Sequence, residues 1–154
     1  MNRVKLSPAN VVILAAGVVI LIGSFMAFYK VSVAGSGSVS VNAWDRGQFM
    51  IATLPALLGI FMALQVGLVA FGHIDMPNRL LGLTWDQVHL VLSLQAALLM
   101  LSFLARTRPS ATFDTIRIET TLGIGFWLML VAAIALVVGA LMRIASTGRR
   151  PHAI

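Results

Sequence analysis

The chain has no cysteine, so disulfides, thiolate metal sites, cysteine-ligated iron–sulfur clusters and a cysteine nucleophile are all excluded. It is also poor in charge, because only 10% of its 154 residues are Asp, Glu, Lys or Arg. A soluble domain of this size needs far more polar residues to cover its surface. The shortage of charge therefore argues against a soluble fold, and with it against a basic nucleic-acid-binding face.

Hydrophobic residues make up 59% of the chain, and the mean hydropathy is +0.96. They gather in four long runs, over residues 11–29, 49–71, 87–105 and 120–144. A helix of such a length crosses a hydrocarbon core of about 30 Å at about 1.5 Å per residue. We therefore expect an all-α membrane protein, with one domain of four transmembrane helices in an antiparallel bundle.

Residues 30–46, between the first two runs, follow another pattern. From Val31 to Val41, valine alternates with small or polar residues on both sides of a Gly-Ser-Gly centre. Such alternation around a glycine turn predicts a small external β-hairpin. Trp44 follows at a position suited to an interfacial indole.

The other connections are predicted to be polar loops, over residues 73–85 and 106–119, and residues 146–154 form a polar cytoplasmic tail. Pro55 lies one or two turns inside the second run, so we expect a local kink there. Asp86 is expected to cap the third helix near its start.

Orientation is read from the basic residues that flank the runs. Arg3 and Lys5 precede the first helix, whereas Lys30 alone follows it closely. Because the first helix usually decides orientation, we expect both termini in the cytoplasm, although the arginines of residues 106–119 favour the reverse. Arginine outnumbers lysine nine to two, a bias common in GC-rich bacteria, so we expect a multi-pass protein of the bacterial cytoplasmic (inner) membrane.

Small residues recur along the second run at spacings of three and four, and along the fourth run at a spacing of seven. Such strips let helix backbones approach closely inside a lipid bilayer. They serve either packing within one bundle, which is the simpler interpretation, or a dimerisation face. The predicted packing residues are Ala52, Ala56, Gly59, Ala63, Gly67, Gly125, Ala132 and Gly139.

Polar residues mark two faces of the third run. Asp86, His89 and Ser93 share one face, and Gln95 lies on roughly the opposite face. We expect Gln65 of the second helix to form an interhelical hydrogen bond with Ser93 or Gln95, at about the same depth. The third helix should therefore contact two neighbouring helices, or one neighbouring helix and another subunit.

Two groups of ionisable residues are candidate functional sites. Asp86 and His89, with Arg79 nearby, could relay a proton or bind a quinone headgroup, although a simple helix start explains them more economically. Arg106 and Arg108 could meet anionic lipid or an acidic partner, although a solvated loop is the simpler interpretation. We expect no catalytic group, no metal site and no cofactor.

The order of features resembles small four-helix integral membrane proteins of actinobacteria. The resemblance rests on the segments Ser24-Phe25-Met26-Ala27-Phe28-Tyr29 and Ala43-Trp44-Asp45, on the basic N-terminus and on the Ser/Gly/Val loop. Where a Pro-Trp-Tyr often stands in that group, this chain has Ala27-Phe28-Tyr29. The group has no settled activity, so the resemblance implies architecture alone.

The expected function is that of a non-enzymatic accessory or assembly subunit within a larger bacterial membrane complex. Its partners would be the lipid bilayer and other integral membrane subunits or a second copy. Two alternatives stay open: a small homo-oligomeric transport or lipid-handling protein, and a quinone- or haem-associated membrane anchor of a respiratory complex.

Overall fold

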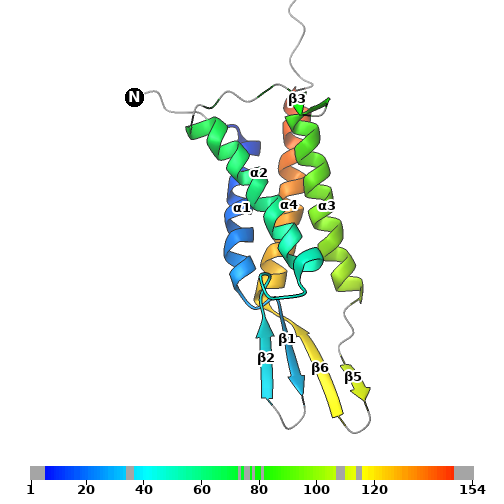
Figure 1. Cartoon of the computed structure of the whole chain (residues 1–154). Helices are drawn as coiled ribbons and strands as arrows, with labels where there is room; N and C mark the ends of the chain where they lie inside the picture. Colours follow the sequence, from blue (N-terminus) through cyan, green and yellow to red (C-terminus); the bar gives the residue numbers. More distant parts are fainter. Residues whose placement is uncertain are drawn as a thin grey trace, which may run out of the picture.

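Four long apolar helices dominate the computed structural model, as expected, and each is long and apolar enough to cross a membrane. They are α1 (Pro8–Phe25), α2 (Leu54–Phe71), α3 (Trp85–Arg106) and α4 (Ile124–Thr147). The structure describes residues 6–33, 37–72, 74, 77, 79–80, 82–106, 110–113 and 116–147. Figure 1 shows the helices side by side, with strands extending beyond one end of them.

The helices begin where local chemistry allows it. Ser7 caps α1 by accepting a hydrogen bond from the Asn10 backbone N–H, at 3.3 Å, with Pro8 in the first turn. Pro55 likewise lies in the first turn of α2, where its missing N–H costs nothing, and it is fully buried. A π-helical segment, η1 (Phe49–Thr53), directly precedes α2. The local kink expected at Pro55 stays a prediction.

The predicted hairpin is present, as β1 (Tyr29–Val33) and β2 (Gly37–Val41), but it is half of a larger sheet. The prediction of a plain loop over residues 106–119 was wrong. That segment contributes β5 (Ser110–Phe113) and most of β6 (Ile116–Leu122) to an antiparallel sheet in the order β2-β1-β6-β5. Isoleucine and threonine favour extended backbone, and β6 takes residues 120–122 from the predicted fourth helix, which begins only at Ile124.

A second, smaller hairpin lies at the other end of the helices. It pairs β3 (Arg79–Leu80) with β4 (Leu83–Thr84), directly before α3. The expected polar connection over residues 73–85 therefore contains short strands in its described part, and its last residue, Trp85, already belongs to α3.

The sheet grows directly out of two helices from opposite ends of the chain. α1 leads into β1, β6 leads into α4, and the backbone N–H of Gly123 donates to the Phe28 carbonyl at 2.9 Å. A cluster of Phe28, Phe103 and Phe126 fills this junction, with ring centroids 5.1–5.7 Å apart. The aromatic core thus ties the sheet to α1, α3 and α4.

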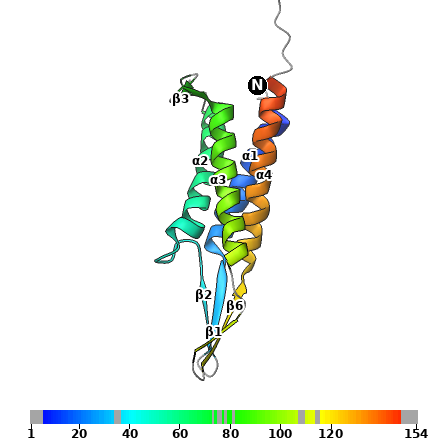
Figure 2. The same ribbon diagram turned by 90° about the vertical axis from the view of Figure 1, so that its right-hand side faces the viewer.

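α1 contacts α4 and α2, and α3 contacts α4 and α2, so the third helix has two neighbours, which is the first of the two expected alternatives. Figure 2 shows the helices from a second side, with the sheet seen nearly edge-on. Small residues stand at the closest approaches. A Cβ at Gly125 would lie 2.6 Å from the Gly23 carbonyl oxygen, and one at Gly139 would lie 2.8 Å from Ile13.

The other small residues predicted for helix packing lie along the same contacts. Gly59 faces Ile20 and Ala63 faces Gly17, both without room for another methyl group at the glycine. Ala52, Ala56 and Ala132 are buried. Gly67 is only partly buried and differs from the rest, as described below.

Candidate functional site

A reciprocal pair of hydrogen bonds sets the start of α3. The backbone N–H of Gln87 donates to the Thr84 hydroxyl at 3.4 Å, and the Gln87 side chain accepts from the Thr84 N–H at 3.0 Å. This is a capping box, so Thr84 caps the helix in place of the expected Asp86. The Trp85 indole adds a bond to the Pro77 carbonyl at 2.9 Å. Asp86 instead contacts another helix.

That contact is Arg143, near the end of α4. Its Nε lies 2.8 Å from Oδ1 of Asp86, and its Nη1 lies 3.0 Å from Nδ1 of His89. α3 and α4 run antiparallel, so the first turn of one meets the last turns of the other, and the i, i+3 spacing places Asp86 and His89 on one face. We call these three residues the polar cluster.

The polar cluster is partly closed to water. The side chains of Asp86 and Arg143 are each 20% exposed, whereas His89 is fully buried. An ion pair between carboxylate and guanidinium lets both charges lie close to apolar helices, because each offsets the other. The cluster therefore joins α3 to α4, and the charges of Asp86 and Arg143 compensate each other.

The guanidinium also determines the form of His89. Arginine offers only donors, so Nδ1 of His89 must accept, and the imidazole is neutral with its proton on Nε2. Nε2 is buried and has no hydrogen-bond partner among the described residues. The cluster can thus hold a neutral imidazole beside a charged pair, which is a proton-sensitive arrangement.

Arg143 was not among the residues predicted from the sequence, although it lies near the end of the fourth apolar run, residues 120–144. A usable signal was present. In a pair of antiparallel helices, an arginine one turn before the end of one helix lies level with an acid in the first turn of the other helix.

The remaining candidates that the structure describes do not join the cluster. Ser93 is fully buried one turn further along α3, with its hydroxyl donating to the Leu90 carbonyl at 3.0 Å. Gln65 is buried on α2, whereas Gln95 is exposed on the outer side of α3, so a bond from Gln65 to either partner stays a prediction. Arg79 is exposed on β3, and Arg106 is exposed at the far end of α3. Arg108 lies outside the described residues.

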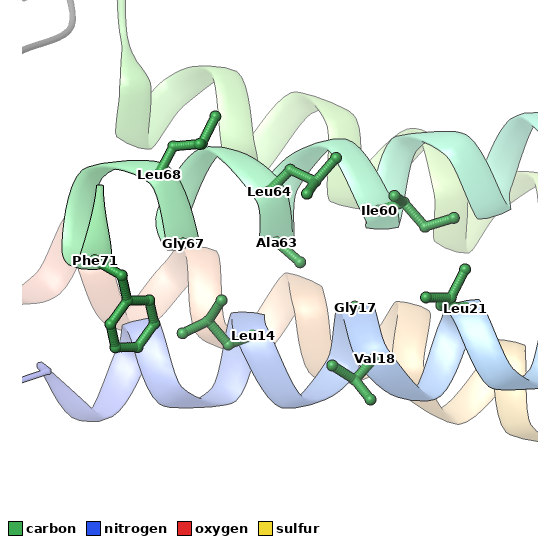
Figure 3. Close-up of a pocket in the computed structure, with 10 residues that line it drawn as sticks. All are labelled: Leu14, Gly17, Val18, Leu21, Ile60, Ala63, Leu64, Gly67, Leu68 and Phe71. Atoms are coloured by element: carbon green, nitrogen blue, oxygen red, sulfur yellow. The ribbon is translucent and has the colours of Figure 1, made fainter. Parts of the chain in front are cut away.

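An open apolar groove of about 350 Å³ follows the contact between α1 and α2. Figure 3 shows its lining, in which Gly67 and Ala63 of α2 stand opposite Leu14 and Gly17 of α1. A Cβ at Gly67 would have Leu14 as its nearest neighbour, at 3.7 Å, which is an ordinary contact. Packing inside the molecule therefore does not require glycine at this position. The lining is Leu14, Gly17, Val18, Leu21, Ile60, Ala63, Leu64, Gly67, Leu68 and Phe71.

The two segments that carry the resemblance contact each other at the sheet end. The Trp44 indole donates to the Ser24 hydroxyl at 3.0 Å, and the Ala43 backbone N–H donates to the Ser24 carbonyl at 3.1 Å. The Phe25 and Trp44 rings lie 5.8 Å apart. Asp45 accepts from the Asn42 N–H at 2.7 Å and closes the turn. These contacts fix the strand β2 to the end of α1.

Within the described part of the chain, no group of three or more His, Cys, Asp or Glu residues could hold a metal ion. Comparison of the chain with protein-family models, with curated proteins and with solved structures finds no match. The resemblance to actinobacterial four-helix proteins therefore stays a prediction.

Proposed function

We propose that this chain is a non-enzymatic accessory or assembly subunit of a larger complex in the bacterial cytoplasmic membrane. In this proposal α1 to α4 cross the bilayer, both termini lie in the cytoplasm, and the four-stranded sheet stands outside the cell membrane. The four long apolar helices support the first part. The placement of both sheet-forming connections at one end supports an even number of crossings.

The sheet has two unlike faces, which supports a docking role. Side chains directly opposite one another in antiparallel strands share a face. On one face, Tyr29 and Val31 of β1 pair with Val41 and Val39 of β2. On the other face, Lys30 and Ser32 pair with Ser40 and Ser38. One face is therefore apolar and the other polar.

The single observation that carries the proposal is that no described element forms a layer over this apolar face. Tyr29 reaches the Phe103 ring of α3, with centroids 6.1 Å apart, but the sheet continues past the helix ends. No helix covers its distal part in either view (Figures 1 and 2). Val39 is 67% exposed. A one-sided apolar sheet normally packs on a second layer, so we assign the missing layer to the external part of a neighbouring membrane subunit.

Charge substitutions on the two faces test this proposal. Val39→Asp places a carboxylate on the apolar face, and Ser40→Asp places one on the polar face of the same strand, so the second variant is a matched control. Each tagged protein is expressed in its native host and extracted in mild detergent. We expect wild type and Ser40→Asp to elute with the same protein partner and Val39→Asp to lose it. Elution of wild type as a lone monomer, or equal behaviour of both variants, contradicts the proposal.

A further inference from the structure

We infer that Asp86, Arg143 and His89 form an acid-sensitive clasp between the start of α3 and the end of α4. The clasp holds while His89 is neutral, and it opens when His89 takes up a proton. It concerns the polar cluster at the end of the helices away from the sheet, so it does not depend on the proposed docking face.

The positions of the protons carry the inference. Nη1 of Arg143 points a hydrogen at Nδ1 of His89 across 3.0 Å, so Nδ1 must be bare for the contact to exist. When Nδ1 carries a proton, it is a hydrogen-bond donor and can no longer accept from Nη1 of Arg143. The proton also places an imidazolium beside a guanidinium, and like charges at such a distance repel strongly in an apolar setting. The Arg143–His89 bond therefore breaks when His89 is protonated.

The described residues that pack against α3 offer few charges that could compensate for an imidazolium at His89. The described residues of α2, η1 and β4, which pack against α3, include no titratable side chain. α4 contributes Arg143 alone, and β3 contributes the exposed Arg79, which is also positive. Asp86 is the one acid of the cluster, and Arg143 already binds it at 2.8 Å. Within the polar cluster, one carboxylate then faces two positive groups.

Because His89 is buried, the loss of its bond to Arg143 should also move α3 away from α4. His89 is fully buried, so an imidazolium at this place cannot reach water while α3 and α4 stay closed. Asp86 and Arg143 are each 20% exposed, so protons can reach the cluster from outside. The far end of α3 stays held by the cluster of Phe28, Phe103 and Phe126. Protonation should therefore loosen α3 from α4 at the clasp end alone.

The first test compares wild type with His89→Gln, whose side-chain carbonyl can still accept from Arg143 but does not titrate. The full chain is purified in detergent micelles, and its unfolding temperature Tm is measured between pH 8 and pH 5. The unfolded chain binds a proton that the closed clasp excludes, so stability should fall as pH falls. We expect Tm of wild type to drop roughly 3–5 °C for each pH unit below about 6.5, relative to the variant. Parallel curves for the two proteins overturn the inference.

A second test needs no change at the clasp. In the variant His73→Gln/His152→Gln, His89 is the only histidine left, so its ring nitrogens can be followed alone by ¹⁵N NMR. We expect a neutral ring with the proton on Nε2 at pH 8, and exchange broadening of α3 signals near His89 at pH 5. A proton on Nδ1 at pH 8, or unchanged α3 signals on protonation of the ring, overturns the inference.

Discussion

Gly125 on α4 and Gly67 on α2 have different roles in helix packing. A Cβ at Gly125 would lie 2.6 Å from the Gly23 carbonyl oxygen and 2.8 Å from that of Met26, so backbone blocks the space from two sides. At Gly67 the nearest atom is a methyl carbon of Leu14 at 3.7 Å, on the wall of an open groove. Gly125 is therefore needed for the crossing of α1 and α4, and Gly67 is not needed by the chain itself.

Alanine substitutions should separate these two positions. Gly125→Ala forces the helices apart, so we expect it to lower the free energy of unfolding by about 1–3 kcal/mol. Gly67→Ala fits without displacement and favours helix, so we expect it to raise that free energy by about 0.5–1 kcal/mol. Unfolding by SDS in mixed micelles measures both. Equal losses at the two positions would mean that the groove at Gly67 is closed.

At the scale of the elements, the sheet joins the two halves of the chain. β1 comes from the connection after α1, β6 from the connection before α4, and the two pair antiparallel with Val31 opposite Thr120 and Ser32 opposite Glu119. β2 is separated from β6 by β1. This register predicts which pairs of residues lie close enough for a disulfide to join them.

The absence of cysteine makes that register easy to test. Val31→Cys with Thr120→Cys should form an internal disulfide under mild oxidation, because directly opposed strand residues lie within the reach of a disulfide. Val39→Cys with Thr120→Cys is the control, since β1 lies between them and two strand spacings of about 4.8 Å exceed that reach. Thiol titration before and after reduction gives the result. A disulfide in the control pair, or none in the first, contradicts the sheet order.

The sequence predicted an element correctly where a segment had only one kind of periodicity, that of a strand or that of a helix. The alternation of valine from Val31 to Val41 predicted the first hairpin correctly. The alternation in β6 was overlooked because Thr120 to Leu122 run without a break into the apolar residues of α4. Asp86 and His89 could be placed on one face from their spacing, but Arg143 is more than fifty residues away, and only the antiparallel pairing of α3 and α4 brings it to them. The periodicity of a segment predicts a helix or a strand. A cluster of side chains from two helices, however, depends on how the helices pack together.

At the scale of the whole molecule, the two ends of the described structure differ in kind. One end carries the four-stranded sheet and the junction of Phe28, Phe103 and Phe126, and the other carries the start of α1, the small hairpin β3–β4 and the polar cluster. If the helices cross a bilayer, these two ends face different compartments. Ser40 on β2 and Ser146 near the end of α4 are both exposed and lie at opposite ends.

Single cysteines at these two serines test the proposed topology. In intact cells we expect a membrane-impermeant maleimide to label Ser40→Cys and to leave Ser146→Cys unlabelled until the membrane is permeabilised, because α4 would carry the second position to the cytoplasmic side. The cysteine-free wild type is the control for background labelling. Labelling of Ser146→Cys alone in intact cells would reverse the orientation and leave four crossings in place. Labelling of both in intact cells would contradict the crossing of the membrane by α4, because the sheet and the end of α4 would then share one compartment.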